Sequence, residues 1–568
     1  MIFLPDNDKM ELTCNKLKNE RKQGGNCMKK GLKILTAFLL SVTMLAGCGK
    51  GKESTEKGKT GEKTETNEKT GTAKDGGILR VGLSANVVQL DPVKYTAVYE
   101  SNVMRSIYDT LVTYNHDLTK IVPSLAKEWK ISDDMMTYTF KLRDDVHFQK
   151  GKYQDGRKLT AEDIKYSLMR SLNKSAMKRL RYVKEIEVLS DTEVKIVLEK
   201  PYAPFLVMLT DAGNSIVCKE EVEGHGDNYT RNPVGTGPFS FDSWQADSYI
   251  TLKRNEKYYG NKPHLDGLKF SFITDSNMMG NALQSGDIDL ATNVQGTNIQ
   301  AIKANDKLEM QQIQGLSIGY FSFNVNYEPF KNLKVRQAMN LALNREDLTR
   351  GIYKFGEAKP GYLPIPRASW GYSEEAEKTV KDMSGGTPEK IEEAKKLMKE
   401  AGYENGFNVE LYCSNSRVNA ATVMQAQMEK IGVKIAIKPL EWGAFSDTVS
   451  KGNAQSYIMG WTWYPDPDFF LFQMTHSNQI GALGNGGQFK NAEVDKLLDE
   501  ATTKTVDQKE RAKIYADALK VIAKELPHLD LYDQDIITAT NKKVKGFTPK
   551  ADQSLVFVSE EKNVWMDK

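Results

Sequence analysis

The stretch IMGWTWYPDPDFFLF, residues 458–472, is the densest aromatic segment of the chain. Residues 457–459 favour a strand that runs into Gly460. Pro465 and Pro467 lack backbone donors and are poorly tolerated inside helices or central strands, so we expect the aromatic residues after Gly460 to lie on a stiff, irregular loop. Large aromatic side chains are costly to leave in water, so this loop either packs into a core or lines a pocket.

Length and composition limit the alternatives. The chain has 568 residues, which exceeds the usual size of one hydrophobic core and predicts two or three lobes. Its hydrophobic content of 40% and charged content of 27% are typical of soluble globular proteins. The formal net charge of +3 gives no support for binding to nucleic acid or to a strongly acidic ligand.

An apolar segment near the N-terminus has the organisation of a bacterial lipoprotein signal. A basic start (MKKGLK, residues 28–33) precedes an apolar run at 34–44, and Leu45-Ala46-Gly47 then leads to Cys48. The run is too short for a membrane-spanning helix of ~20 residues. We therefore expect residues 28–47 to be a lipoprotein signal peptide. A diacylglyceryl group on Cys48 would anchor the protein to the membrane, since two acyl chains hold where one does not.

The segments around this signal are not expected to fold. Residues 1–27 are polar and without periodicity, and the codons of Gln23-Gly24-Gly25 could encode a ribosome-binding sequence just upstream of Met28. Our hypothesis is that translation starts at Met28 and that 1–27 is a mis-assigned leader. Residues 48–75 are rich in Gly, Lys, Glu and Thr and have little to bury, which predicts a flexible charged tether.

From Gly76 onward, strand and helix patterns alternate. Thr160 and Asp163 have the spacing of a helix N-cap and its third residue. Pro388–Ala401 is amphipathic and is followed by Gly402, a typical helix stop. The clearest strands are predicted at 78–83, 138–143, 183–189 and 193–198. This alternation indicates an α/β class with mixed sheets.

The sequence offers no residues for catalysis. A nucleophile elbow, a phosphate loop, a dinucleotide fingerprint and an HExxH motif are all missing, and histidines such as His147 and His528 stand alone. Cys218 and Cys413 have no companions at metal-ligand spacing. We expect two buried free thiols, with a disulfide between them left open, and no catalytic residue, metal site or cofactor.

Seven segments, taken in order, resemble one family. They match the peptide/nickel class of extracellular solute-binding proteins that serve ABC importers, and the match runs from about Gly76 to the C-terminus. Each segment alone is weakly specific, but their order is highly specific. The segments are IYDTLV at 107–112, PSLAKEW at 123–129, YTFKLR at 138–143, GRKLTAED at 156–163, NPVGTGPF at 232–239, KVRQAM at 334–339 and PDP at 465–467.

The resemblance implies a fold. It is the large three-domain, type II variant of the two-lobed periplasmic-binding-protein-like fold, in which the lobes close on a ligand about a hinge. The aromatic stretch then lies in the C-terminal lobe as the floor of the cleft. The implied domains are domain I at 76–115, 232–329 and 526–568, domain II at 116–231, and domain III at 330–525.

The resemblance also implies how a peptide is held. Backbone pairing would come from two rims, Ala97–Glu100 with Val98 and Tyr99, and Gly460-Trp461-Thr462. Trp461 and Trp463 would form the walls of side-chain pockets. Arg417, which follows the predicted strand 409–413, matches the arginine that holds the ligand carboxylate in dipeptide-binding members.

The amine end of the ligand is where this sequence departs from the family. Many peptide-binding members carry an Asp shortly after their Gly-Trp pair, whereas this chain reads Trp463-Tyr464-Pro465 and is one residue shorter. Asp466 or Asp468 could take that role, although Asp466 could equally cap the following helix. A cation–π contact with Trp463 or Tyr464 could replace the ion pair, which would suit a cationic solute or a modified or N-blocked peptide.

We therefore predict the substrate-binding lipoprotein of an ABC importer. It would be a monomer, anchored through Cys48 to the outer face of a Gram-positive cell membrane, and would deliver a short peptide to a permease driven by its ATPase. A modified peptide, a cationic solute or chelated nickel are alternatives within the family. A surface receptor or sensor that does not transport is an alternative of another class, and an enzyme on this scaffold is a third. No nucleic-acid partner is expected.

Overall fold

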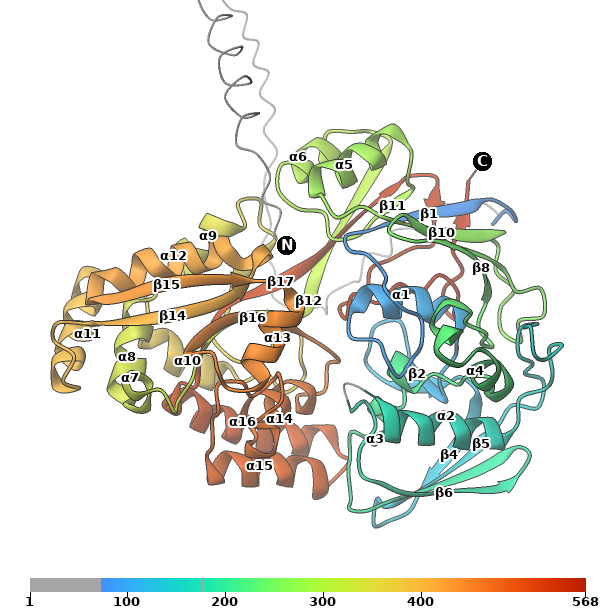
Figure 1. Cartoon of the computed structure of the whole chain (residues 1–568), viewed down its shortest axis with the longest axis horizontal. Helices are drawn as coiled ribbons and strands as arrows, with labels where there is room; N and C mark the ends of the chain where they lie inside the picture. The colour runs from blue at the N-terminus through green and yellow to red at the C-terminus, as the bar shows by residue number, and fades with distance from the viewer. Residues whose placement is uncertain (1–72, 176–177, 568) are drawn as a thin grey trace, which may run out of the picture. The chain divides into compact units, whose positions relative to one another are not determined.

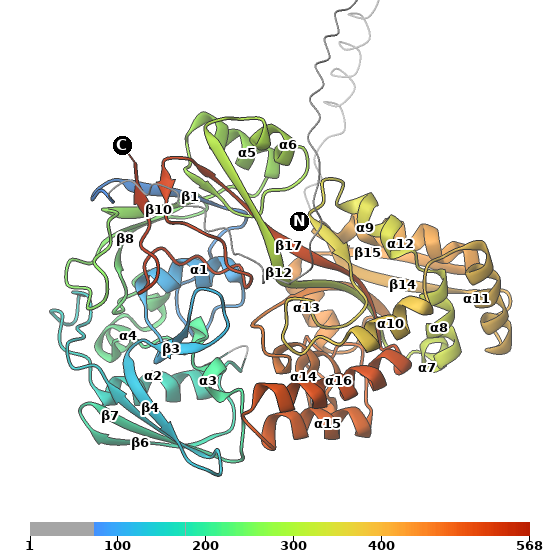
Figure 2. The same cartoon turned by 180° about the vertical axis from the view of Figure 1, so that it is seen from behind.

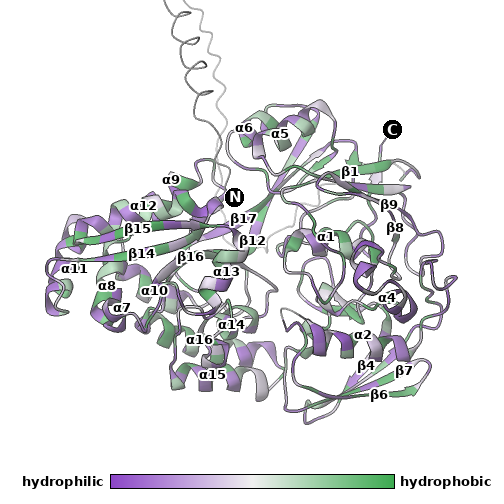
Figure 3. Ribbon diagram, in the orientation of Figure 1, coloured by the Kyte–Doolittle hydropathy of each residue, from purple (hydrophilic) through white to green (hydrophobic). Residues whose placement is uncertain are grey.

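The computed structural model describes residues 73–175 and 178–567, which fall within one compact unit, Thr70–Lys568 (Figure 1). The predicted leader, the signal peptide, Cys48 and most of the tether lie outside the described residues. No helix in the described ranges is long and apolar enough to cross a membrane. Hydrophilic and hydrophobic residues are mixed along helices such as α2 (Ala161–Lys174) (Figure 3).

One mixed sheet connects the N-terminal and C-terminal halves of this unit. Within the described chain it has eleven strands in the order β15-β14-β16-β12-β17-β11-β1-β10-β9-β8, with β13 pairing off this path to β17. Its strands are β1 (Ile78–Leu83), β8 (Phe239–Gln245), β9 (Tyr249–Arg254), β10 (Gly267–Phe272), β11 (Leu290–Ala291), β12 (Leu308–Phe323), β13 (Ala358–Pro360), β14 (Phe407–Ser414), β15 (Val433–Leu440), β16 (Ser456–Thr462) and β17 (His528–Asn541).

Two long antiparallel strands, β12 and β17, pass from one half to the other in both views (Figures 1 and 2). One end of β17 pairs with β11, and the other end pairs with the part of β12 that lies beside β16. The register between β12 and β17 shifts between Gln314 and Ile318. Bulges of this kind bend a strand pair, so the sheet changes direction where it leaves the N-terminal half.

The N-terminal half also contains a separate four-stranded antiparallel sheet in the order β4-β5-β7-β6. Helix α2 packs on this sheet, and Phe140, Ile164 and Leu168 are fully buried between them. The remaining elements of this half are α1 (Val98–Ile107), β2 (Val112–Tyr114), β3 (Ile121–Pro123), β4 (Ala126–Ile131), β5 (Thr137–Leu142), β6 (Val183–Ser190), β7 (Glu193–Leu198), α3 (Phe205–Met208), α4 (Lys219–His225), α5 (Ser276–Ser285) and α6 (Asn298–Lys303).

In the C-terminal half, helices cover both faces of β14, β15 and β16. Ile458 packs with the cluster of α8, α9, α11 and α12, whereas its neighbours Tyr457, Met459 and Trp461 pack with the cluster of α13 to α16. Successive residues of a strand point to opposite faces, which explains this division. The helices are α7 (Glu328–Lys331), α8 (Leu333–Ala342), α9 (Arg345–Ile352), α10 (Glu374–Asp382), α11 (Pro388–Glu400), α12 (Val418–Met428), α13 (Trp442–Ser450), α14 (Asp468–Thr475), α15 (Ala492–Thr503) and α16 (Gln508–Glu525).

Several local predictions are confirmed. The strand pair β6–β7 forms as predicted, and α2 begins after Thr160, whose N–H donates to the Asp163 carboxylate at 2.9 Å. Cys218 and Cys413 are both buried and free. These features depend on residues that are close in sequence or on simple apolar patterns, so the sequence determines them well.

The prediction of one irregular loop after Gly460 is wrong in extent. Trp461 and Thr462 still belong to β16, because Thr462 pairs with Ser317 of β12. Asp468–Thr475 forms helix α14, with Pro467 at its N-cap. Proline is tolerated at the first turn of a helix, where its missing N–H has no intrahelical partner. Only residues 463–467 connect the two elements irregularly.

Candidate ligand-binding site

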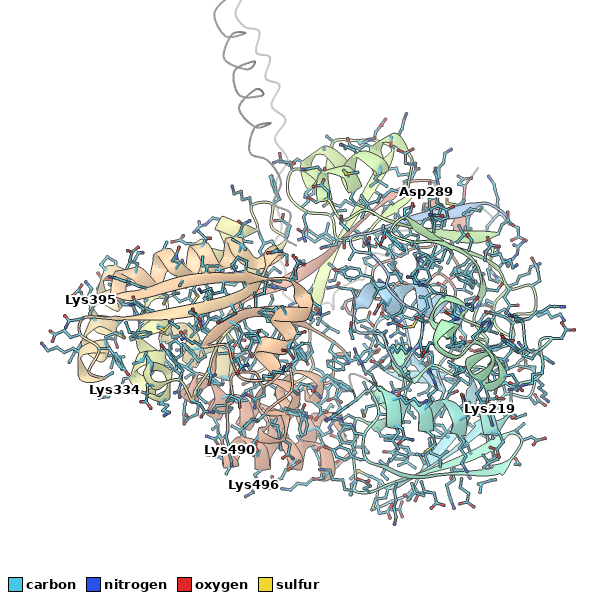
Figure 4. The ribbon with its side chains drawn as sticks, viewed as in Figure 1. Lys219, Asp289, Lys334, Lys395, Lys490 and Lys496 are labelled. Atoms are coloured by element: carbon cyan, nitrogen blue, oxygen red, sulfur yellow. The ribbon has the colours of Figure 1, made fainter. Side chains whose placement is uncertain are left out.

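A cavity of about 950 Å³ lies between residues of the N-terminal and C-terminal halves. This volume falls in the range of ~300–1,000 Å³ that is typical of small-molecule sites. Charged groups at the periphery, such as Lys395 and Lys219, point outward (Figure 4). The cavity, by contrast, is bordered by arginines from both halves, Arg105, Arg179 and Arg417.

Most residues that the sequence placed in the cleft line this cavity. They are Val98, Tyr99, Arg417, Gly460, Thr462, Trp463 and Tyr464. Trp461 and Asp466 are not among the lining residues. The structure therefore brings together a site from helix α1, from the segment after β14, and from the end of β16.

Trp461 faces away from the cavity. It alternates with Gly460 and Thr462 along β16, so its ring points into the opposite core, where its Nε1 donates to the Phe469 carbonyl at 2.9 Å. Its side chain retains 7% exposure. The expectation that Trp461 forms the wall of a ligand pocket is corrected by this alternation.

Asp466 is occupied within the fold. Its carboxylate accepts from Arg511 Nη1 and Nη2 at 2.8 and 2.9 Å, and it also accepts from the Asp468 N–H at the start of α14. Asp468 in turn accepts from Arg181 Nη2 at 2.7 Å. Neither acid faces the cavity, so the expectation that one of them binds the ligand amine is corrected. The alternative role of Asp466 at the helix start is the observed one.

The side chain of Arg417 lies beside two glycines on paired strands. Gly460 of β16 pairs with Gly319 of β12. A Cβ at Gly460 would lie 2.1 Å from Arg417 Nη2, and a Cβ at Gly319 would lie 2.2 Å from the Tyr532 ring. The side chains of Arg417 and Tyr532 therefore pack directly against the backbone of these two glycines, and Arg417 Nη1 donates to the Tyr532 hydroxyl. This packing fixes the position of the guanidinium at the cavity wall.

The two proposed rims differ in their backbone. On the C-terminal side, the described part of β14 accompanies β16 only as far as Ile458, so the edge of 459–462 on that side has no strand partner. On the N-terminal side, Val98–Glu100 is the first turn of α1, and the Thr96 and Ala97 N–H groups both donate to the Glu100 carboxylate. Ala97 is extended but Val98–Glu100 is helical, so these residues do not present a continuous strand edge for the predicted pairing.

Side chains from the N-terminal half contact the aromatic segment across the cavity. Asp211 accepts from the Tyr95 hydroxyl at 2.6 Å, from the Tyr464 hydroxyl at 3.2 Å and from Arg179 at 3.2 Å. Asp211, Tyr95 and Arg179 were not predicted as site residues, because no local pattern connects residues so far apart. Arg105 lies seven residues after Val98, on the same helix face, and that spacing was a signal the sequence contained.

Trp463 is already engaged by a cation of the protein. The Arg179 guanidinium lies 4.6 Å from the centre of its ring. Its indole Nε1 is buried and has no partner within the described residues. Because Arg179 occupies this ring face, the structure does not favour a cationic ligand that stacks on Trp463.

Two halves joined by a shared sheet, with a cavity of charged and aromatic side chains between them, define a two-lobed solute-binding protein. The model of the bacterial extracellular solute-binding proteins, family 5 Middle, matches residues 120–482. The chain belongs to this family of extracellular solute-binding proteins, and its α/β fold is the two-lobed one that the sequence predicted.

Relatives share most of their length with this chain. The dipeptide-binding protein of Escherichia coli K12 is 31% identical over 474 residues, which cover 78% of this chain and 86% of that protein. Heme-binding protein A of Haemophilus influenzae is 31% identical over 472 residues, which cover 78% and 84%. The structure of the periplasmic binding protein DppA from Helicobacter pylori with peptide STSA has a TM-score of 0.77 and 30% identity, and covers 87% of this chain and 99% of that chain. The dipeptide-binding and heme-binding relatives are equally identical to this chain but are named for different ligands. Overall identity therefore does not indicate the ligand, and the residues of the cavity must be considered instead.

Proposed function

We propose that this protein captures a short peptide in the cavity and delivers it to the permease of an ABC importer, whose separate ATPase supplies the energy. The observation that carries this proposal is the position of Arg417 beside the free edge of β16. A fixed guanidinium holds a carboxylate directionally. The adjacent edge offers backbone hydrogen bonds, each contributing about 1 kcal/mol net and independent of side chains.

The proposed binding residues have distinct roles. Arg417 holds the terminal carboxylate, and Gly460 leaves the space that this arrangement needs. Thr462 belongs to the edge that pairs with the peptide backbone. Val98, Tyr99, Trp463 and Tyr464 form apolar and aromatic walls for peptide side chains.

The architecture supports a proposed hinge. β12 and β17 connect the halves, and their register shift near Gln314 marks a place where the pair bends. We assign domain I to 76–115, 232–329 and 526–568, domain II to 116–231 and domain III to 330–525. Closure about β12 and β17 would bring the α1 wall toward Arg417.

Anchoring through Cys48 completes the proposal. Lipid on this thiol would hold a monomer on the outer face of a Gram-positive membrane, with the tether 48–75 as a spacer. A Cys48→Ala variant should move from the membrane fraction to the soluble fraction on cell fractionation. Retention of this variant in the membrane would contradict the anchor.

The test of the proposed cargo is native mass spectrometry of the purified protein. We expect a mass increase that corresponds to one bound peptide and that disappears on denaturation, without turnover of the released molecule. Release of a chemically altered molecule, or a bound solute with no peptide bond, would contradict the proposal.

A further inference from the structure

Arg105 borders the same cavity as Arg417, but from the opposite wall. It lies near the end of α1 on the helix face shared with Val98 and Ser101. Its Nη2 donates to the Tyr464 hydroxyl at 3.1 Å, and its Nη1 lies 3.5 Å from the Thr210 carbonyl oxygen. Its Nε is buried without a partner. This guanidinium therefore meets only neutral acceptors and leaves donors unused.

The neighbouring buried arginines, by contrast, have carboxylate partners. Arg179, Arg181 and Arg511 each have a carboxylate oxygen at 2.7 to 3.2 Å. Within residues 73–175 and 178–567, no Asp or Glu oxygen lies within 4.0 Å of a nitrogen of Arg105 or of Arg417. A charge taken out of water without a partner is unfavourable, so an external anion would complete both sites.

The acids of the cavity are not free to serve as those partners. Besides the contacts of Asp211 given above, Glu357 accepts from the backbone N–H groups of Gly296 and Phe355 at 3.0 and 2.9 Å. Asp552 accepts from the backbone and hydroxyl of Ser554. Asp211 and Glu357 are thus used within the protein, whereas Asp552 acts on Arg105 from beyond 4.0 Å, so that Arg105 and Arg417 both keep donors for a ligand.

Arg105 also stays charged. Burial alone lowers the pKa of its guanidinium, but the neighbouring Tyr464 and Asp552 raise that pKa above its usual value. Besides Arg179 and Lys354, the cavity therefore holds two arginines from different halves that have no carboxylate oxygen within 4.0 Å in the described residues, and each can donate more than one hydrogen bond to a carboxylate.

The two cations contact the same segment at different points. Arg417 lies over Gly460, and Arg105 reaches Tyr464. Both arginines border the same cavity and contact different residues of the segment 460–464, so one ligand can meet both. The end of the ligand that lies opposite Arg417 thus meets a guanidinium rather than an acid.

We propose that Arg105 is a second anion-binding site and that the cargo is a short peptide or peptide conjugate with a carboxylate near each end. This inference rests on the proposed function, since it places the first carboxylate at Arg417. It also gives a reason for the absence of an acid after the Gly-Trp pair, because an ammonium group would be repelled there.

The test uses two probes that differ in one charge. Succinyl-dialanine carries two carboxylates, and its succinamide analogue replaces only the succinyl carboxylate by an amide. By isothermal titration calorimetry with the lipid-free mature chain, we expect the diacid to bind at least tenfold more tightly. Arg105→Gln should reduce the affinity for the diacid to that for the amide and leave the amide affinity unchanged. Arg350→Gln, at an exposed arginine outside the cavity, is the matched control and should change neither affinity.

The outcomes separate the two proposals. Equal affinity of the unaltered protein for both probes, or equal weakening of both by Arg105→Gln, overturns the second anion site and leaves the site at Arg417 standing. Binding of neither probe to the unaltered protein contradicts the proposed function and this inference with it. Arg105→Lys keeps the charge and should retain part of the preference, and equal thermal unfolding of the variants excludes misfolding as the cause.

Discussion

Two arginines approach the aromatic segment from different sides, and their surroundings differ. Arg511 is buried against Asp466, with both ends of its guanidinium bound to one carboxylate. Arg417 lies on bare backbone at the cavity wall and donates to the Tyr532 hydroxyl. The first charge is neutralised within the fold, and the second is the one for which we propose a ligand carboxylate. Whether an arginine has a carboxylate partner within the fold therefore distinguishes a structural charge from a charge available for binding more reliably than its position in the sequence does.

The largest expected effect comes from breaking the structural pair. Asp466→Ala leaves the Arg511 guanidinium buried with no carboxylate, because the side chains are only 3% and 6% exposed. Loss of one partner of a buried ion pair destabilises a protein by about 3–5 kcal/mol. Urea unfolding followed by circular dichroism measures this change.

An exposed pair provides the control for that experiment. Asp447→Ala removes the partner of Lys451, and both side chains are at least 60% exposed. This variant should lose no more than about 0.5 kcal/mol. If Asp466→Ala were as stable as Asp447→Ala but no longer bound peptide, Asp466 would belong to the binding site and the comparison would fail.

The next effect concerns Arg417, the charge that we propose binds the ligand. Gly460→Ala places a methyl group where Arg417 Nη2 now lies, at 2.1 Å, so the guanidinium must move. We expect peptide affinity to fall by about tenfold or more, or at least 1.4 kcal/mol, although the charge itself is retained. Calorimetric titration of the variant measures this loss.

Gly443→Ala is the matched substitution. This glycine lies in α13, and an added Cβ would meet nothing within 4 Å. Alanine is favoured over glycine in a helix by about 0.5–1 kcal/mol, so this variant should be slightly more stable and bind normally. Equal binding by both variants would show that the position of the Arg417 guanidinium does not depend on the absence of a side chain at residue 460.

A further effect is expected from Asp530, a buried acid whose carboxylate has no Lys, Arg or His nitrogen within 4.0 Å in the described part of the chain. Burial raises the pKa of Asp530 in β17 to about 8, and the Arg345 charge opposes this shift only in part. The unfolded chain has an Asp pKa of about 3.9. Between about pH 4 and pH 8 the folded state therefore holds a proton that the unfolded state releases. The free energy of unfolding should fall as the pH rises through this window, by at most about 1.4 kcal/mol per pH unit.

Asp530→Asn should remove part of this dependence, because the amide does not titrate. Burial also raises the pKa of Asp533 to about 7, so some slope should remain. Urea unfolding at several pH values between about 5 and 8 measures the slope. An unchanged slope in the variant would mean that Asp530 is ionised in the fold.

The sequence predicted what depends on near neighbours and on overall order. The α2 cap, the β6–β7 pair, the family and most of the residues predicted to lie in the cleft were accessible in this way. Asp466 was misassigned because Arg511 lies 45 residues away along the chain. Trp461 was misassigned because the strand continues further along the chain than the nearby prolines suggested. Side chains alternate along a strand, so the Trp461 ring points to the face away from the cavity. The net charge of +3 gave no support for an acidic ligand, whereas Arg105, Arg179 and Arg417 come together at the cavity from separate segments.

The central claim is that Arg417 binds the terminal carboxylate of the cargo. The most direct measurement compares succinyl-dialanine with its C-terminal amide, by calorimetry, on the unaltered protein and on Arg417→Gln. A charged hydrogen bond contributes about 1.5–3 kcal/mol, so the unaltered protein should prefer the free acid by about tenfold or more, and the variant should bind both ligands alike. An undiminished preference for the free acid in Arg417→Gln would contradict the account.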